Sequence, residues 1–458
     1  MDRPDLVIAG GTVVTTERAL PADVAVIGGR IAAIGPDLGA GAPEVVDATG
    51  LLVLPGVVDV HTHLRLPTPD EPDRFRADSL AAARGGTTTF LTFNNPGTGI
   101  SREGSRSPLR ALDEFRTRTD GQSAVDFGLS AVITGEQDDP LAELPALVDA
   151  GVPTFKAFMV YDFRLPDADL ERAMRVAARH GGMLQVHCEE PAIIEPLIRE
   201  ALAAGRTGCG HHALTRPTRA EAAATRKAIE MARRAEASLY IVHLSCAEAL
   251  EAVAEAKARG EPVHAETCPH YLTLTHRAYT DPDESRVIRA VISPPLRSPA
   301  DVDALWQGLA GGILDVVASD HVPDRLDREK RLPAPPFPEV SNGAPGIETL
   351  LAVVYSQGVA TGRLSLGRLV DVLSTTPARL FGMPAKGAVE VGRDADLVLF
   401  DPSARRTIRQ ADLHHTSDFT PYEGLRVSGA IRRVLLRGRP VEVDATGRFL
   451  ERVAPTAA

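Results

Sequence analysis

Two histidines, His61 and His63, stand two residues apart at the end of the short apolar run VVDV, residues 57–60. If this run forms a β-strand, its period of two places both imidazoles on one face, where they converge on the same point. Two solvated loop histidines would be the simpler explanation for an isolated pair. The pair is not isolated in this chain, so we interpret it as part of a metal site.

Four further residues that can bind a metal or move a proton lie in or directly after other apolar runs. Lys156 lies in VPTFKAF, His187 and His243 end two later runs, and Asp320 directly follows the run that ends at Ser319. Each has a simpler explanation on its own, such as a lysine that reaches solvent or a histidine satisfied in the core. What favours chemistry is that the same kind of residue recurs at the end of several runs.

The apolar runs alternate with helical segments through the middle of the chain. The predicted strands are residues 57–60, 87–93, 126–133, 152–158, 183–187, 239–243, 263–267 and 314–319. Between them, apolar side chains at 170, 173, 174 and 177 have helical spacing, and Thr218 with Glu221 and Ser245 with Glu248 predict capping boxes at two helix starts. Eight strands, each followed by a helix or a long connection, predict a (β/α)8 TIM barrel. The C-terminal ends of its strands form one mouth, so the six residues above should converge there.

Both ends of the chain have a different pattern. Residues 6–54 are short β-type runs broken by glycine, without helical period, and residues 388–401 and 428–444 have the same character. We therefore expect the N- and C-terminal segments to form one small β-sandwich domain. The predicted division is residues 1–55 and 386–445 for the β-sandwich domain, 56–385 for the catalytic barrel, and 446–458 for a C-terminal tail.

Composition excludes several classes of function. The 458 residues carry a net charge of -11 with a pI near 5.7, which argues against a nucleic-acid partner. The N-terminal segment lacks the features of a signal peptide, and no apolar stretch is long enough to span a membrane. We expect a cytoplasmic protein without a membrane partner, whose four cysteines are reduced.

The donor set indicates a particular chemistry. Four histidines and an aspartate suit a divalent ion such as zinc, and five ligands are more than one catalytic zinc uses. A lysine aimed at metal ions is unfavourable as an ammonium. As an N6-carboxylated lysine (a carbamate), Lys156 can bridge two metals. Such a pair of ions would activate water and polarise a carbonyl, with Asp320 passing a proton to the leaving nitrogen. This chemistry is amide hydrolysis.

Several motifs resemble those of the cyclic amidohydrolases, closest to the dihydropyrimidinase and D-hydantoinase branch. They extend over nearly the whole chain and include HTH (61–63), FKAFMVY (155–161), VHCEE (186–190), HHALTRP (211–217), VHLSC (242–246), ETCPHYL (266–272), ISPPLR (292–297), SDH (319–321), SNGAPGIE (341–348), LSTTPARLFG (373–382) and VGRDADLVLFDP (391–402).

This resemblance implies a role for each metal-site residue. His61, His63 and Asp320 would hold one ion, His187 and His243 the other, with carboxylated Lys156 between them. The resemblance also implies a homotetramer.

Three further positions carry over to the substrate. Tyr161 resembles the tyrosine that hydrogen-bonds the oxyanion, and Ser293 and Asn342 resemble the pair that reads the imide of the substrate ring. A surface aromatic for Tyr161 and turn chemistry for Ser293 and Asn342 are the alternatives.

Two positions depart from the hydantoinase pattern. HLRLP (63–67) and FNNPG (93–97) are more similar to dihydroorotases and allantoinases, in which an arginine and an asparagine grip a carboxylate or ureido group. Arg65 and Asn95 would take these roles here. The alternative for Arg65 is a loop salt bridge with Asp70 or Glu71.

The function predicted from the sequence is metal-dependent hydrolysis of the ring amide of a dihydropyrimidine or 5-substituted hydantoin to an N-carbamoyl amino acid. One alternative is dihydroorotase- or allantoinase-like opening of an acidic or ureido ring, which Arg65 and Asn95 favour. Another is a non-catalytic scaffold related to dihydropyrimidinase, which would have no need of a complete metal site.

Overall fold

The computed structural model describes residues 3–94 and 105–455. Its central feature is a sheet of eight parallel strands that pair in chain order, from β8 at one edge to β15 at the other. A bridge between Thr62 and His321, with the His63 amide donating to the His321 carbonyl at 2.8 Å, joins the two edges into a barrel. The strands are β8 (Val57–Thr62), β9 (Thr87–Phe93), β10 (Asp126–Val132), β11 (Thr154–Phe158), β12 (Met183–His187), β13 (Leu239–Ile241), β14 (Val263–Thr267) and β15 (Val316–Val317).

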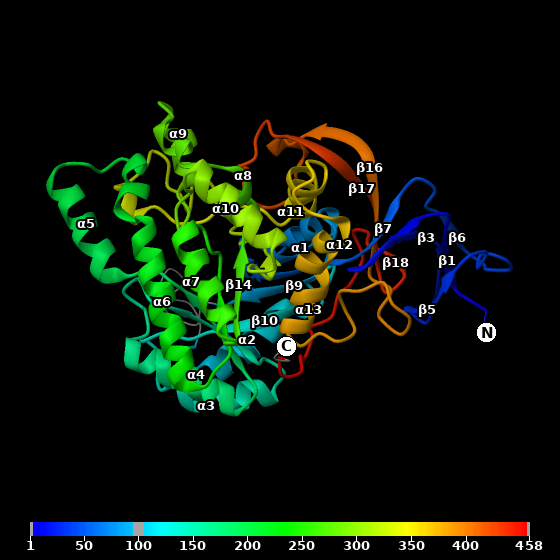
Figure 1. Ribbon diagram of the computed structural model, residues 1–458, viewed down its shortest axis with the longest axis horizontal. Coiled ribbons are helices and arrows are strands. Elements are labelled where there is room, and N and C mark those ends of the chain that lie inside the picture. Colours follow the sequence, from blue (N-terminus) through cyan, green and yellow to red (C-terminus); the bar gives the residue numbers. More distant parts are fainter. Residues whose placement is uncertain (1–2, 95–104, 456–458) are drawn as a thin grey trace.

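Helices surround this barrel, as Figure 1 shows. They are α1 (Arg74–Arg84), α2 (Pro108–Thr119), α3 (Pro140–Asp149), α4 (Asp167–Arg179), α5 (Pro191–Ala203), α6 (Thr218–Ala235), α7 (Ala247–Ala258), α8 (Pro269–Thr273), α9 (Glu284–Val287), α10 (Pro299–Ala310), α11 (Leu350–Val354), α12 (Leu366–Val370) and α13 (Thr376–Leu380). The strands are almost wholly buried because helices and barrel interior cover both their faces. The predicted (β/α)8 TIM barrel is confirmed.

Two sheets built from the chain ends lie at one side of the barrel (Figure 1). The first contains β1 (Leu6–Ala9), β4 (Asp23–Ile27), β5 (Arg30–Gly35) and β6 (Val45–Asp47). The second contains β2 (Thr12–Val14), β3 (Ala19–Pro21), β7 (Leu52–Pro55), β16 (Leu397–Thr407), β17 (Arg426–Leu436) and β18 (Arg439–Pro440). Antiparallel pairing of β7 with β16 joins the N- and C-terminal segments, and one apolar core contains residues of both sheets, including Ile8, Val24, Val53 and Leu397. The predicted small domain from both chain ends is confirmed.

The segment after β18 returns to the barrel. The Gly447 amide donates to the Ser123 carbonyl at 2.8 Å, and the Leu450 amide to that of Phe127 at 2.7 Å. Arg452 is buried and donates to the Thr154 hydroxyl at 2.9 Å. This part of the predicted C-terminal tail therefore packs against the N-terminal ends of barrel strands, while the exact domain bounds stay a prediction.

A buried ion cluster ties the barrel to the C-terminal segment. The Lys386 ammonium lies 2.6 Å from Asp126 Oδ2, 2.9 Å from Asp394 Oδ2 and 2.7 Å from Asp396 Oδ2. Asp126 begins β10 and also pairs with Arg437 after β17. The three carboxylates share the buried Lys386 ammonium, so this cluster is a structural connection between the parts of the chain.

The helix predictions are correct in part. Leu170, Ala173, Met174 and Ala177 are the buried residues of α4, as their spacing predicts. Both predicted capping boxes are wrong, because α6 and α7 begin without a side-chain cap. Their residues have tertiary partners instead: the Thr218 hydroxyl donates to Glu248 at 2.6 Å, and Glu221 accepts the Ser245 amide at 2.7 Å. The capping box among the described helices is at α10, between Ser298 and Asp301.

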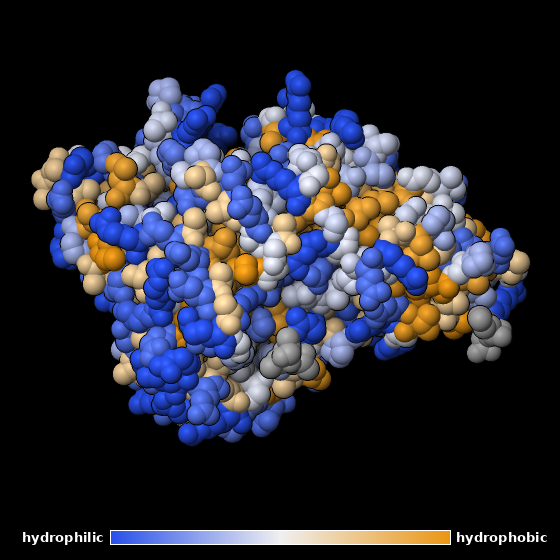
Figure 2. Space-filling model, viewed as in Figure 1, coloured by the Kyte–Doolittle hydropathy of each residue, from blue (hydrophilic) through white to orange (hydrophobic). Residues whose placement is uncertain are grey.

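The hydropathy of the surface residues differs between the barrel side and the terminal sheets. Figure 2 shows hydrophilic residues over the outer helices near α3 and α4, and hydrophobic residues gathered over the terminal sheets. No helix in the described ranges is both long and apolar enough to cross a bilayer.

Candidate active site

The six predicted metal-site residues lie together at the C-terminal ends of the barrel strands. His61 is in β8, Lys156 in β11 and His187 at the end of β12. His63 follows β8 by one residue, His243 follows β13 by two and Asp320 follows β15 by three. Residues far apart in the chain therefore converge on one mouth because parallel strands end on the same side of the barrel.

The closest group consists of two imidazoles and a carboxylate. Asp320 Oδ1 lies 3.0 Å from His61 Nε2 and 3.4 Å from His63 Nε2. The three ligand atoms lie within 4.8 Å of one another. This arrangement suits a divalent ion, which needs several nitrogen and oxygen donors around one point.

The other imidazoles and the lysine adjoin this group. Lys156 Nζ lies 3.4 Å from His61 Nε2, and the His243 ring centroid lies 5.3 Å from that of His61 and 4.6 Å from that of His187. His243 is 3% exposed, and its Nδ1 has no hydrogen-bond partner among the described residues. A buried ring nitrogen without a partner is costly, so a metal ligand role would account for it.

Burial changes the protonation of this cluster. It lowers the pKa of Lys156 to about 8 and that of His63 to about 4, and it holds that of His243 well below its usual range. Burial also acts to raise the pKa of Asp320, but the nearby imidazoles, His61 first, keep it well below its ordinary value. The pKa of His61 shifts the other way: although burial and Lys156 act to lower it, the Glu266 and Asp320 carboxylates raise it. The neutral imidazoles of His63 and His243, the ionised Asp320 carboxylate and the readily neutralised Lys156 are the forms that bind metal or react with carbon dioxide.

Three residues of the site have a left-handed backbone. The φ angles are 78° at Tyr161, 39° at His243 and 47° at Asp320. Residues other than glycine rarely adopt positive φ, and such conformations concentrate at functional sites because surrounding packing must hold them. Here they turn three side chains into the pocket at strand ends.

Glu266, at the end of β14, supports the metal-site histidines from below. It is fully buried, and Oε1 accepts from His61 Nδ1 and, at 3.1 Å, from the His243 amide. The Tyr240 hydroxyl donates to Oε2 at 2.8 Å. A carboxylate that accepts a hydrogen bond from a ligand histidine fixes the ring orientation and raises its basicity. Glu266 is not among the residues predicted for the site, although an acidic residue within the predicted strand VHAET (263–267) was a signal for it.

A second carboxylate, Glu189, supports His187. His187 Nε2 lies 2.8 Å from Glu189 Oε2, and the Arg216 guanidinium lies 2.5 Å from the same oxygen. Although burial acts to raise the pKa of Glu189, Arg216 and His187 together lower it to about 2. Arg216 also lies over the Tyr161 ring at 5.5 Å. Arg216 was not predicted as a site residue, because nothing in the motif HHALTRP shows which of its side chains points into the barrel.

The cluster opens into a pocket of about 740 Å³. Its wall includes the apolar side chains Phe158, Phe163, Ile194, Ile198 and Phe337. Polar and charged side chains, including the metal-site residues, form the rest of its lining. A pocket of this size can hold a small molecule.

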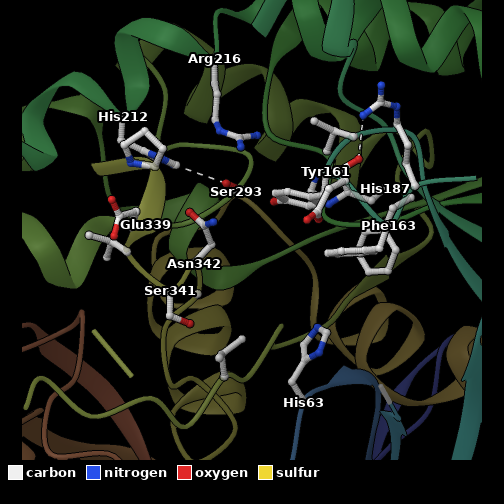
Figure 3. A pocket seen from close by; sticks show the side chains of 18 of the residues that line it. His63, Tyr161, Phe163, His187, His212, Arg216, Ser293, Glu339, Ser341 and Asn342 are labelled. Carbon is white, nitrogen blue, oxygen red and sulfur yellow. Dashed lines mark hydrogen bonds between the residues drawn. The ribbon is translucent and has the colours of Figure 1, made fainter. Parts of the chain in front are cut away.

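The predicted substrate residues Tyr161, Ser293 and Asn342 all line this pocket. Figure 3 shows Ser293 and Asn342 on one side, facing Tyr161 and His187 on the other. Ser293 is 7% exposed, and its hydroxyl lies 3.4 Å from His212 Nε2. Asn342 Oδ1 is buried without a partner in the described part of the chain. Burial raises the pKa of Tyr161, so its phenol stays protonated and can donate.

Arg65 lines the pocket, but its charge is paired. Arg65 Nη2 donates to Asp324 Oδ1 at 2.6 Å, and Asp324 is fully buried. The alternative of a salt bridge to Asp70 or Glu71 named the wrong acids, since the partner lies 259 residues away in the sequence. Asn95 lies outside the described residues.

The chain is similar to known proteins over almost its whole length. The sequence pattern of the Amidohydrolase family matches residues 52–441. The D-hydantoinase of Rhizobium radiobacter is 38% identical over 447 residues, 96% of each chain, and that of Geobacillus stearothermophilus is 39% identical over 445 residues, 95% of this chain and 93% of the relative. The crystal structure of dihydropyrimidinase from Brevibacillus agri NCHU1002 superposes with a TM-score of 0.92 at 38% identity, covering 99% of both chains. The chain therefore belongs to the amidohydrolase family.

Proposed function

We propose that this chain is a metal-dependent cyclic amidohydrolase that hydrolyses the ring amide of a dihydropyrimidine or 5-substituted hydantoin to an N-carbamoyl amino acid. The observation that carries the proposal is the convergence of four histidines, Asp320 and Lys156 at the mouth of the barrel, where all of them except His61 line one pocket. Relatives whose names state hydantoinase or dihydropyrimidinase activity, similar over almost the whole chain, support the substrate class.

The residues present fit a pair of divalent ions, zinc by their donor chemistry. His61, His63 and Asp320 would hold one ion, His187 and His243 the other, and N6-carboxylated Lys156 would lie between them. The unpartnered His243 Nδ1 and the lowered pKa of Lys156 support this donor set. When bound, the ions would supply an acidified water and polarise the ring carbonyl.

The chain's own residues would then carry the proton and hold the ring. A carboxylate oxygen of Asp320 accepts the proton of the attacking water and passes it to the leaving ring nitrogen. The Tyr161 hydroxyl donates to the oxygen that becomes negative as the carbonyl is attacked. Ser293 and Asn342 bind the imide across the pocket, and the apolar wall around Phe158 and Phe163 excludes water from the substituent.

A turnover screen of the purified, metal-loaded protein tests the substrate. We expect hydrolysis of dihydrouracil or hydantoin, followed by release of the N-carbamoyl product. Elemental analysis should find about two divalent ions per chain, and electron density in a crystal should show a carbamate on Lys156. A fully active preparation with one metal or none, or with a free amine at Lys156, would refute the metal chemistry.

The second candidate is opening of an acidic or ureido ring, such as dihydroorotate or allantoin. The presence of Arg65 in the pocket favours it. If Arg65 binds a substrate carboxylate, Arg65→Met should lower kcat/KM for acidic rings by roughly 10- to 150-fold and change neutral rings by only a few fold. Efficient dihydroorotate turnover that is lost in Arg65→Met would replace the first candidate by the second. A non-catalytic scaffold is disfavoured because it has no need of the six metal-site residues.

The proposal also includes the oligomeric state, the cellular location and the domain division. We propose a homotetramer, a cytoplasmic location and the division into a β-sandwich domain (1–55 and 386–445), a barrel (56–385) and a tail (446–458). Light scattering on the purified protein tests the tetramer. A monomer at micromolar concentration would refute it.

A further inference from the structure

Lys330 is a buried lysine outside the metal cluster. Its side chain is fully buried, in the segment that leads from β15 to Asn342. The ammonium donates to the carbonyls of Val291 at 2.9 Å, Ser341 at 2.7 Å and Gly343 at 2.7 Å. An ammonium has three N–H donors and no acceptor, so these bonds use its whole capacity.

The three carbonyls come from the two segments that carry the candidate imide-binding residues. Val291 lies two residues before Ser293, while Ser341 and Gly343 stand on either side of Asn342. The Gly343 amide also donates to the Val291 carbonyl at 3.0 Å, so the two segments meet at the point that Lys330 binds. We call this meeting point, formed by Lys330 and the carbonyls of Val291, Ser341 and Gly343, the junction. The relative position of Ser293 and Asn342 therefore depends on the junction.

The second segment is also held against the strand end that carries Asp320. The Val322 amide donates to the Ala344 carbonyl at 3.0 Å. Gly343 has a φ of 126°, and a Cβ there would lie 2.4 Å from Val322 Cγ2, so only glycine allows this approach. Junction and metal site are consequently parts of one packed unit.

Burying a charged lysine at this junction costs desolvation free energy. Burial lowers the pKa of Lys330 to about 8, and the Asp324 carboxylate and then Cys209 act in the opposite direction. No carboxylate among the described residues forms a direct ion pair with it, and its Nζ lies over the Phe419 ring at 6.0 Å from the centroid. An apolar residue would avoid the desolvation but could not satisfy three converging carbonyls.

We propose that Lys330 is a positioning residue for substrate recognition, which joins the two segments that carry Ser293 and Asn342 at the separation needed to read the substrate ring. The proposal rests on the proposed function for the roles of Ser293 and Asn342. Lys330 itself contacts no substrate; it acts through the peptide carbonyls that it binds.

Hydrogen exchange of the full-length, metal-loaded protein tests the junction without using activity. Lys330→Met removes the three donors and keeps the length of the side chain. We expect faster exchange in residues 288–296 and 339–346, which include the Gly343 amide. If Lys330→Met does not fold, Lys330→Gln, which keeps two donors, is measured in its place. Unchanged exchange in both segments would overturn the proposal.

Lys257→Met is the matched control. Lys257 Nζ lies 2.8 and 2.7 Å from the carboxylate oxygens of Asp315, which precedes β15 at the other end of the barrel. This variant also loses a lysine with oxygen partners, so it should lower the melting temperature. It should leave hydrogen exchange in residues 288–296 and 339–346 unchanged, and it should not change the kinetics. An equal loosening of these segments by Lys257→Met would show general destabilisation and refute a specific role for Lys330.

Kinetics then connect the junction to recognition. With a hydantoin substrate, Lys330→Met should raise KM about tenfold and change kcat by less than about threefold, because ring contacts are lost in ground and transition state alike. Combined with Ser293→Ala, the effect on kcat/KM should be clearly less than the product of the single effects. Full additivity would overturn the proposal. A wild-type protein that hydrolyses neither hydantoin nor dihydrouracil would refute the proposed function instead, and the exchange test would still decide whether Lys330 joins the segments.

Discussion

Glu266→Gln isolates the charge that Glu266 places beneath the metal site. Glu266 Oε1 accepts from His61 Nδ1 and the His243 amide, while Oε2 accepts from Tyr240. A glutamine with its amide oxygen in the Oε1 position keeps the first two bonds, and its amide nitrogen can donate to the Tyr240 oxygen. The substitution therefore changes charge with little change in shape.

The expected effect is on metal binding. Without the carboxylate, the His61 imidazole is a weaker base and its tautomer is less firmly fixed. Loss of such a supporting group costs roughly 10- to 100-fold in metal affinity or activity, about 1.4 to 2.7 kcal/mol. Substrate affinity in the fully loaded enzyme should change little, because Glu266 does not line the pocket.

Chelator competition measures this loss directly. Metal release from wild type and Glu266→Gln is followed by a chromophoric chelator, and kcat is measured with excess metal present. Tyr240→Phe serves as the control, since it removes one hydrogen bond to Glu266 and keeps the charge. If Glu266→Gln retains metal as tightly as wild type, the carboxylate does not support His61 and the reasoning is wrong.

Three further changes test separate parts of the molecule. Asp320→Asn should lower kcat by roughly 10²- to 10⁴-fold in protein whose metal content has been checked, and near-normal turnover would exclude a proton-transfer role. Lys386→Met leaves three carboxylates with one cation fewer, so thermal unfolding should report a loss of about 3 to 5 kcal/mol; a shift below 1 kcal/mol would contradict a structural role. Burial raises the pKa of Glu348 from 4.5 to about 7, so the folded state binds more protons than the unfolded state between these values. Stability should fall as pH rises through that window, by about 1 to 3 kcal/mol, and Glu348→Gln should flatten the profile in denaturant titrations.

The barrel could be predicted because its signals are local. Each strand is an apolar run of a few residues, and parallel strands that end on one side bring the residues after them together whatever their sequence separation. His61, Lys156 and His187 could thus be placed at one mouth without any knowledge of tertiary contacts. The exact strand ends could not be predicted: β13 stops at Ile241, and β15 has only two residues. His243 and Asp320 consequently follow their strands by two and three residues, each with a left-handed backbone.

The errors concern partners that are distant in the chain. Thr218 and Glu221 have the spacing of a capping box, but Glu248 and Ser245 offer them better hydrogen bonds from the next βα unit. Arg65 was matched with acids close in sequence, whereas its partner is Asp324. Glu266 and Lys330 were missed for a related reason, since residue type alone does not distinguish a buried charge from a solvated one.

The charges around the pocket also bear on the substrate. Each arginine among its described lining residues has a carboxylate partner within 4 Å. These pairs are Arg65 with Asp324 at 2.6 Å, Arg164 with Glu195 at 3.2 Å, Arg216 with Glu189 at 2.5 Å and Arg331 with Glu339 at 3.5 Å. A substrate carboxylate would have to share Arg65 with buried Asp324, whose own charge repels it and also stabilises the Lys330 ammonium. A neutral ring meets no such competition, because it asks the pocket for hydrogen bonds rather than for an unpaired cation. The charge balance of the wall therefore favours a neutral cyclic ureide over dihydroorotate.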